Sequence, residues 1–236
     1  MGCILKGGGG LYSRLVVGAV VLASGTGDQP GERPTCLLEL GGVALIRRLL
    51  IALSGAGVDE VVVVVQGHHA KQIEPALQDF PITVVQGPPA HGDKAASMRV
   101  GLAALAGKLD AVLLSPANQP MVNAQDLTQL IGAYKKRPEG SHMVVPQVDG
   151  VAGNPLIFSS ELREQMLAGA ADIDCRQWCA DHADLLSAFA TSNKRYRVAI
   201  DTLDDIARFE AGTGHRLSWP ASLRLPVDAV DMLARP

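Results

Sequence analysis

The chain has 236 residues, of which 47% are hydrophobic and 19% are charged, and its formal net charge is −3. These values are ordinary for a globular α/β protein with one large core, and they lack the basic excess that nucleic-acid-binding proteins usually carry. No apolar run reaches the roughly 18 residues that a membrane-spanning helix needs, so we expect a cytoplasmic protein that handles small molecules, with neither nucleic acid nor membrane as a partner.

The first expected element is a buried strand over residues 15–22, where an unbroken apolar run is rich in β-branched side chains. The same region resembles a secretion signal, because Lys6 and Arg14 precede the apolar run and small residues follow it. A cleavage there would delete the strand, so we favour the strand and treat residues 1–14 as a leader. The four cysteines are too few for a disulfide scaffold and fit reduced thiols in a cytosol.

Strands and helices alternate along the next hundred residues. The run from Val61 to Val65 is typical of a strand that is covered on both faces. The strand–helix order predicts a mostly parallel, Rossmann-like sheet between two layers of helices. The expected strands are residues 59–67, 82–85 and 111–114, and the expected helices are residues 42–55, 73–77 and 94–105.

The second half of the chain is less regular. Two variant capping boxes, Asn123–Asp126 and Thr202–Asp205, each predict the start of a helix, the first with Ile131 among its inward residues and the second ending at Gly212. Residues 213–236 contain three prolines and no clear element, so we expect a tail that wraps the domain or makes a homodimer contact. The remaining expected elements are strands at residues 143–146 and 156–158, a turn at 149–153 and a helix at 159–167.

The loop after the first strand is a candidate ligand loop, because ligands of open α/β sheets bind beyond the carboxyl ends of the strands. Gly25 and Gly27 permit a sharp turn whose N–H groups can receive phosphate oxygens, although a plain turn is the alternative. The chain has no Gly-Lys pair followed by Ser or Thr, as a Walker loop requires, and Pro30 stands where a dinucleotide fingerprint needs its third glycine. The loop therefore matches neither of these two phosphate-binding motifs.

The stretch Leu22–Gly27 followed by Leu37–Gly42 resembles the opening of the MobA-like nucleotidyltransferases, which include molybdenum cofactor cytidylyltransferase and guanylyltransferase. More distantly it resembles the methylerythritol-phosphate cytidylyltransferases. The likeness covers about residues 16–212 and implies a fold of the nucleotide-diphospho-sugar transferase type, with residues 15–212 as the domain. The later stretches that fall in family order are Ser97–Leu102, Pro116–Val122, Gly153–Phe158 and Ile200–Asp205.

The resemblance implies transfer of a nucleoside monophosphate from a nucleoside triphosphate, CTP or GTP favoured, to a phosphorylated acceptor such as a molybdopterin-type cofactor, with Mg²⁺. It places the acceptor at Gly153 and Asn154 and the metal at Asn118 and Asp201. The implied nucleotide-binding residues are Ala23, Ser24, Gly25, Thr26, Gly27 and Ser97.

The chain departs from the family at three charged positions. Gln29 stands for the loop arginine, Thr35 for the loop lysine and Asn118 for the metal-binding aspartate. Arg33 is the only Lys or Arg between residues 14 and 47, so it is the loop residue that can replace the missing cations, although a solvated surface charge is the alternative. We therefore take Arg33, Thr35 and Asn118 as the catalytic candidates.

These losses leave a second function open. The chain could be a catalytically impaired relative that binds a nucleotide or a protein partner in a regulatory or assembly role. An oxidoreductase is a distant third, because the dinucleotide fingerprint fails. Cys175, Cys179 and His182 have the spacing of one helix face but lack an evident fourth ligand, and we treat them as core.

Overall fold

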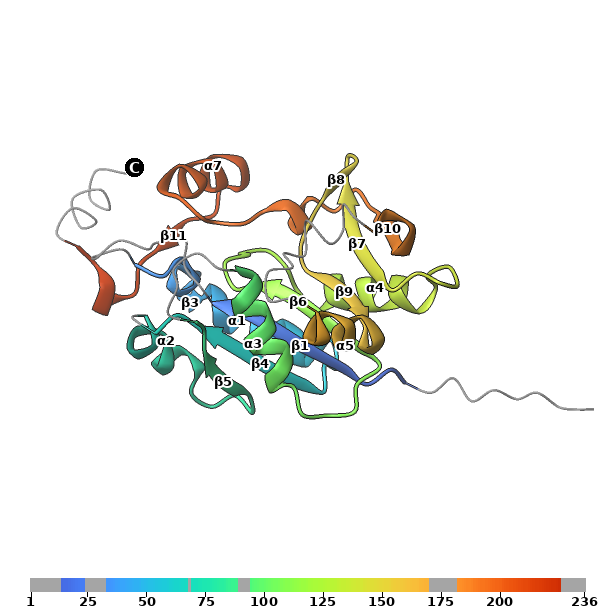
Figure 1. Ribbon diagram of the computed structural model, residues 1–236. Coiled ribbons are helices and arrows are strands. Elements are labelled where there is room, and N and C mark those ends of the chain that lie inside the picture. Colours follow the sequence, from blue (N-terminus) through green and yellow to red (C-terminus); the bar gives the residue numbers. More distant parts are fainter. Residues whose placement is uncertain (1–13, 24–32, 68, 89–93, 170–181, 226–236) are drawn as a thin grey trace, which may run out of the picture.

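The computed structural model describes residues 14–23, 33–67, 69–88, 94–169 and 182–225. Its centre is an eight-stranded sheet with the order β10-β7-β9-β6-β1-β4-β5, in which β8 pairs with β7 (Figure 1). Only β8 and β9 run antiparallel to their neighbours, so the predicted mostly parallel sheet is confirmed. The strands are β1 (Val17–Ala23), β4 (Glu60–Val65), β5 (Thr83–Gln86), β6 (Ala111–Pro116), β7 (Met143–Val148), β8 (Val151–Ala152), β9 (Leu156–Ser159) and β10 (Leu186–Ala190).

Strand β1 lies in the middle of the sheet because its side chains are apolar on both faces. Val20 pairs in register with Val62 of β4 and Leu114 of β6. Val21 packs into one buried cluster and Val20 into another on the opposite face. This double burial is what the β-branched run predicts for a central parallel strand.

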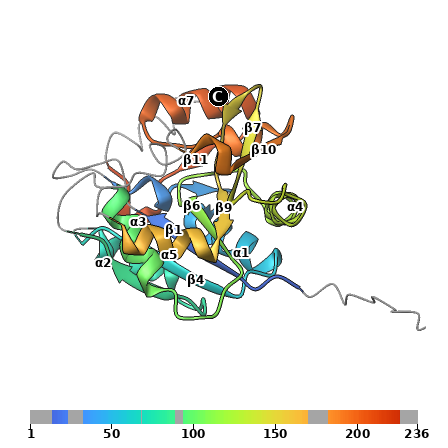
Figure 2. The same ribbon diagram turned by 45° about the vertical axis from the view of Figure 1, so that its right-hand side comes forward.

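Helices cover both faces of the sheet, as expected for a three-layer fold. Figure 2 shows α4 on one side of the sheet and α3 with α5 on the other. The first layer contains α1 (Leu45–Gly55), α2 (Ala70–Leu77) and α4 (Ala124–Lys135), and the second contains α3 (Lys94–Ala104) and α5 (Ser160–Ala168). The 3-10 helices are η1 (Thr35–Leu37), η2 (Ala183–Leu185), η3 (Lys194–Arg197) and η4 (Ala221–Leu223). Within the described ranges, no helix is both long and apolar enough to cross a membrane.

Helix α3 packs unusually close to the sheet at Gly101. A β-carbon at this position would lie 2.4 Å from Val20 Cγ1 and 2.8 Å from Val64 Cγ2, closer than real contacts allow. The glycine of the motif that begins at Ser97 therefore serves helix–sheet packing. It fixes the depth at which α3 carries Ser97 beside the ends of β4 and β5.

Two arginines join α3 to α5, because each donates hydrogen bonds to carbonyl oxygens at the end of the other helix. Arg99 of α3 donates to the carbonyl oxygens of Met166 at 2.8 Å and Gly169 at 3.1 Å, at the end of α5. Arg163 of α5 donates to the carbonyl oxygen of Leu102 at 2.9 Å, near the end of α3. Each arginine thus satisfies carbonyls that a helix end leaves without a partner.

The described part of the tail forms structure, which corrects our expectation for residues 213–225. Strand β11 (Leu217–Ser218) pairs with β2 (Glu39–Leu40), which pairs with β3 (Val43–Ala44) in a three-stranded sheet. The tail wraps onto its own domain because Leu217 and Trp219 bury their side chains against the cluster around Leu38. Residues 226–236 lie outside the described ranges.

Both predicted capping boxes are confirmed, at the starts of α4 and α7 (Leu203–Thr213). Helix α7 ends one residue later than expected, at Thr213, because Gly214 rather than Gly212 adopts the left-handed conformation of a C-terminal cap, with φ of 72°. Ile131 of α4 packs against the core, as expected of an inward residue, and is partly buried.

Buried Asp126 of the first capping box also anchors the segment that follows β10. Its carboxylate accepts hydrogen bonds from Asn193 Nδ2 at 2.7 Å and from Arg195 at 2.6 and 2.9 Å. Burial raises the pKa of the Tyr196 hydroxyl, which donates to the carbonyl oxygen of Asp126 at 2.7 Å. The result is a rigid connection that leads from α4 toward Asp201.

Candidate active site

The carboxyl end of β6 brings the central candidate residues to the edge of the sheet. The loop after β6 is tied to β1, because Ala117 N donates to the carbonyl oxygen of Leu22 at 3.0 Å. Asn118 and Gln119 follow directly, beside the segment that leads into α7. Ligands of open α/β sheets bind at this edge, so the topology places both residues where a site is expected.

Asn118 and Asp201, the two residues predicted to bind metal, lie in direct contact. Asn118 Nδ2 donates to Asp201 Oδ1 at 2.9 Å and to the carbonyl oxygen of Ile200 at 3.0 Å. Ile200 N in turn donates to the carbonyl oxygen of Asn118 at 3.0 Å. The carboxylate of Asp201 and the carbonyl of Ile200 are both acceptors, so the amide nitrogen of Asn118 must face them and its oxygen must point elsewhere.

The amide oxygen of Asn118 is buried and makes no hydrogen bond within the described residues. A buried polar atom without a partner calls for an explanation such as a bound ion or water. Mg²⁺ prefers oxygen ligands and binds through one or two carboxylates together with substrate phosphates. In the structure, however, the Asn118 amide turns its N–H group toward Asp201 and its oxygen away. Asp201 therefore offers a carboxylate to a metal ion, and Asn118 would add its oxygen only with the amide reversed.

The predicted acceptor residues lie next to the same loop. Gln119 Nε2 donates to the carbonyl oxygens of Asn154 at 3.0 Å and Tyr196 at 3.3 Å, and Asn154 N donates to the Tyr196 oxygen at 2.8 Å. A β-carbon at Gly153 would lie 2.6 Å from that oxygen, so only glycine allows this approach. The sequence alone did not assign this linking role to Gln119, although Gln119 belongs to the family motif Pro116–Val122.

Ser97 lies across the sheet edge, near the ends of β4 and β5. Its hydroxyl accepts a hydrogen bond from Gln66 Nε2 at 3.4 Å, and both side chains are buried. A β-carbon at Gly87 would lie 3.4 Å from the same hydroxyl, so the backbone passes close to the pair. Sequence analysis missed Gln66, which could have been found as the first polar residue after the valine strand.

The candidate phosphate loop is described only at its two ends. Ala23 is the buried last residue of β1, whereas Ser24, Gly25, Thr26, Gly27 and Gln29 lie outside the described residues. Thr35 begins η1 and is partly buried. Arg33 NH1 donates to the carbonyl oxygen of Leu223 at 3.0 Å, and its guanidinium carbon lies 4.1 Å from the centre of the Trp219 ring.

Histidine and cysteine side chains are also possible metal ligands. His69 is buried at the start of α2, where its Nδ1 lies 3.3 Å from Gln72 Oε1. Cys175 and Cys179 lie outside the described residues. Among the residues that the structure describes, no three His, Cys, Asp or Glu side chains are placed to hold a metal ion.

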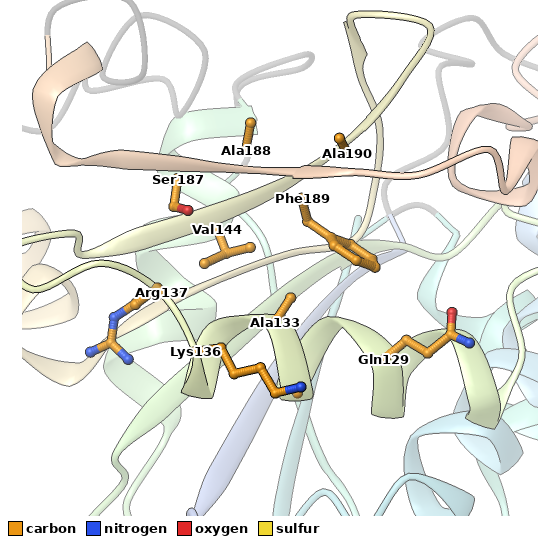
Figure 3. A pocket seen from close by; sticks show the side chains of 10 residues that line it. Gln129, Ala133, Lys136, Arg137, Val144, Ser187, Ala188, Phe189 and Ala190 are labelled. Atoms are coloured by element: carbon orange, nitrogen blue, oxygen red, sulfur yellow. The ribbon is translucent and has the colours of Figure 1, made fainter.

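A separate groove of about 560 Å³ lies between α4 and the edge strand β10. Figure 3 shows Phe189 of β10 directed toward α4, with Lys136 and Arg137 at the end of that helix. Its lining residues come from α4 and the residues just after it, β7 and β10, and include none of the predicted site residues. The groove is therefore distinct from the edge at which Asn118 and Asp201 meet.

The fold and this edge define a three-layer α/β protein whose polar site lies beyond the carboxyl ends of its central strands. Residues 19–185 match the model of the MobA-like NTP transferase domain. The chain belongs to this family, as the sequence resemblance predicted.

Comparison with individual proteins agrees with the family. The bifunctional enzyme IspD/IspF of Clavibacter michiganensis subsp. michiganensis is 30% identical over 207 residues, which are 77% of this chain and 48% of that enzyme. The chain thus spans about half the length of this curated relative. The class that these relatives support is nucleotidyltransferase.

Two solved structures share the fold. A nucleotidyl transferase from Methanothermobacter thermautotroptrophicus is 27% identical, with a TM-score of 0.66 over 84% of this chain and 97% of the other. Rv0371C from Mycobacterium tuberculosis, in complex with manganese, is 22% identical, with a TM-score of 0.61 over 83% of this chain and 97% of the other. The expected nucleotide-diphospho-sugar transferase type of fold is confirmed.

Proposed function

We propose that the protein transfers a nucleoside monophosphate from a nucleoside triphosphate to a phosphorylated acceptor. The observation that carries this proposal is the meeting of Asn118 and Asp201, at 2.9 Å, beside the segment Gly153–Asn154. A metal-and-phosphate position and an acceptor position then share one edge of the sheet. The family supports the reaction class, and we propose CTP or GTP as donor and a molybdopterin-type phosphate as acceptor.

In the proposed reaction an oxygen of the acceptor phosphate attacks the α-phosphorus of the triphosphate. The new bond joins that oxygen to phosphorus, the bond to the bridging oxygen breaks, and pyrophosphate leaves. Negative charge gathers on the oxygens around phosphorus, so cations near them lower the barrier. A bound Mg²⁺ would supply such charge; Asp201 would hold it, and Asn118 would add its amide oxygen with the amide reversed.

The remaining residues bind and orient the substrates. The loop after β1 receives phosphates through backbone N–H groups, and Arg33 contributes the positive charge that Thr35 lacks. Ser97, buried at a depth that Gly101 fixes, supports the nucleotide position from beneath through its contact with Gln66. Gly153 and Asn154 position the acceptor, and Gln119 ties them to the loop that carries Asn118.

One observation favours the second candidate function, a relative that binds nucleotide without turnover. Asn118 directs an N–H group, rather than an oxygen, at Asp201. This hydrogen bond holds the loop after β6 to the segment before α7 without any cation. The two segments therefore keep their arrangement when no metal is bound. In that case the protein would act through the complex it forms, in a regulatory or assembly role.

The first experiment is calorimetric titration of the purified protein with CTP, GTP, ATP and UTP, each with and without Mg²⁺. The proposal expects one triphosphate to bind in a magnesium-dependent manner, followed by pyrophosphate release when a suitable phosphorylated acceptor is added. Binding that ignores Mg²⁺, with no pyrophosphate release, supports the binding protein instead. Absence of binding by all four triphosphates would overturn both readings.

A further inference from the structure

The C-terminal segment around Trp219 contacts the one arginine of the candidate phosphate loop. The guanidinium of Arg33 lies 4.1 Å from the centre of the Trp219 ring. Its NH1 group donates to the carbonyl oxygen of Leu223, 190 residues further along the chain, at 3.0 Å. A stacked guanidinium whose edge binds a carbonyl has a defined orientation, which a solvated surface arginine lacks.

The partner of Arg33 is itself firmly held. Trp219 is 8% exposed and packs with Leu38, Leu40 and Phe209 into the cluster between α7 and the three-stranded sheet. Strand β11, directly before Trp219, pairs with β2. The indole ring is therefore part of a packed core and provides a fixed surface for the guanidinium.

The same cluster reaches the Asn118–Asp201 pair. Ile200 belongs to the cluster and is 1% exposed. Its backbone N–H donates to Asn118, and its carbonyl accepts from the Asn118 amide. One small core thus supports Arg33 on one side and the two candidate metal residues on the other.

We propose that Trp219 is a positioning residue, which holds the Arg33 guanidinium for the β- and γ-phosphates of the bound triphosphate. The inference rests on the proposed function and assigns a role to the C-terminal segment Leu217–Leu223. Thr35 has no charge where the family carries a lysine, so the grip on the phosphates passes to Arg33. The C-terminal segment then forms one wall of the triphosphate site.

The chemistry of arginine suits this arrangement. A guanidinium carries five N–H donors, so it can donate to protein carbonyls and to phosphate oxygens while it stacks on a ring. Its planar fork is pre-organised for phosphate, and the stacking surface reduces the entropy that is lost on binding. A lysine cannot use an aromatic face and a carbonyl in this way to fix a fork, because its ammonium is a compact point charge.

The test is calorimetric titration with the triphosphate that binds the wild type and, in parallel, with the corresponding nucleoside monophosphate. The monophosphate lacks the β- and γ-phosphates and reports on the rest of the site. Trp219→Leu keeps an apolar side chain in the core but removes the aromatic face, whereas Trp219→Tyr keeps an aromatic face. Arg47→Gln is the matched control, because Arg47 lies 4.9 Å from the Phe80 ring and also donates to a carbonyl.

Arg33→Gln is expected to weaken triphosphate binding on the order of 10- to 100-fold, as for loss of hydrogen bonds to a charged group, with little effect on the monophosphate. Trp219→Leu is expected to weaken triphosphate binding about 2- to 10-fold and Trp219→Tyr less. The double variant Arg33→Gln with Trp219→Leu should bind no more weakly than Arg33→Gln alone. Arg47→Gln should match the wild type.

The outcomes separate this inference from the proposed function. If the wild type binds a triphosphate but Trp219→Leu weakens both ligands equally, or adds its full effect to Arg33→Gln, the role of Trp219 is structural and the inference is wrong. Loss of binding in Arg47→Gln would show the same, because the effect would then not be local. If the wild type binds no triphosphate, the proposed function fails and the inference fails with it.

Discussion

Asn118 Nδ2 donates a hydrogen bond to Asp201 Oδ1 at 2.9 Å, and this contact joins the loop after β6 to the segment that opens α7. An aspartate at position 118 would place two carboxylates at this distance, and they would repel each other unless a cation lay near them. The amide keeps the two segments together with a single negative charge. The residue at position 118 therefore decides whether the two segments need a cation to stay together.

Asn118→Asp should make the stability of the fold depend on Mg²⁺. In EDTA the variant loses the donors to Asp201 and to the carbonyl of Ile200, so its unfolding temperature should fall, and Mg²⁺ should recover most of the loss. Thermal unfolding in EDTA and in Mg²⁺ measures the difference. Asn118→Ala removes the same donors without adding charge, so its unfolding temperature should not respond to Mg²⁺; an equal response in both variants would contradict the account.

The double variant Asn118→Asp with Thr35→Lys should raise turnover if the missing charges limit catalysis. It restores a carboxylate for the metal and a cation for the triphosphate, both of which offset charge in the transition state. Pyrophosphate release measures the rate, and circular dichroism checks that the variant is folded. A folded double variant without any gain in rate would count against residual catalysis and favour the binding protein.

Gly101→Ala should destabilise the protein by about 1 to 3 kcal/mol, the usual cost of overpacking. The new methyl group meets Val20 and Val64 at the interface of α3 with the sheet. Because α3 also carries Ser97, triphosphate affinity should fall together with stability. Urea unfolding and calorimetry measure the two effects.

Gly132→Ala is the matched control for that substitution. Gly132 lies within α4, and a β-carbon there meets no atom within 4 Å. Alanine is favoured over glycine in a helix by about 0.5 to 1 kcal/mol, so this variant should be slightly more stable than the wild type. Equal destabilisation by the two variants would show that the effect at Gly101 does not arise from its contacts with the sheet.

Arg195→Met should destabilise the protein by about 2 to 4 kcal/mol, because it leaves the buried carboxylate of Asp126 without its cation. The hydrogen bonds from Arg195 also hold the segment that leads to Asp201. Urea unfolding measures the loss. Arg208→Met breaks an exposed ion pair with Asp205 and should change stability by less than about 1 kcal/mol; equal effects of the two variants would refute a special role for the Asp126 pair.

The cap of α7 should make stability fall at low pH. Burial alone would raise the pKa of Asp205, but hydrogen bonds from the hydroxyl and N–H of Thr202 and the N–H of Asp201 outweigh it and lower the pKa below its usual 3.8. A lowered folded-state pKa contributes stability that is complete above the unfolded value and is lost as the pH falls through the folded one. Asp205→Asn should therefore reduce the difference in unfolding free energy between pH 7 and pH 3.

Thr202→Val tests the cause of that pH dependence. It removes the hydroxyl that donates to Asp205 Oδ2 at 2.8 Å and keeps the carboxylate. Part of the same difference between pH 7 and pH 3 should disappear, as measured by urea unfolding at the two pH values. A wild-type difference in both variants would mean that other carboxylates carry the acid sensitivity.

Local sequence was sufficient for most of the secondary structure. The valine run of β4 and both capping boxes depend on the conformations of a few neighbouring residues, and the structure confirms them. The end of α7 was misplaced because Gly212 and Gly214 are both suitable caps, and only the backbone path decides which one turns left-handed. The tail was missed because β11 has only two residues and forms by pairing with β2.

The candidate site required the tertiary structure. The family resemblance selected Asn118 and Asp201, 83 residues apart, but only the fold shows that an amide N–H faces the carboxylate. The contacts of Arg33 with Trp219 and of Ser97 with Gln66 have no signal in the spacing of their residues. Periodicity records which backbone conformation and which face are favoured locally, whereas the meeting of distant side chains depends on how the whole chain closes around its core.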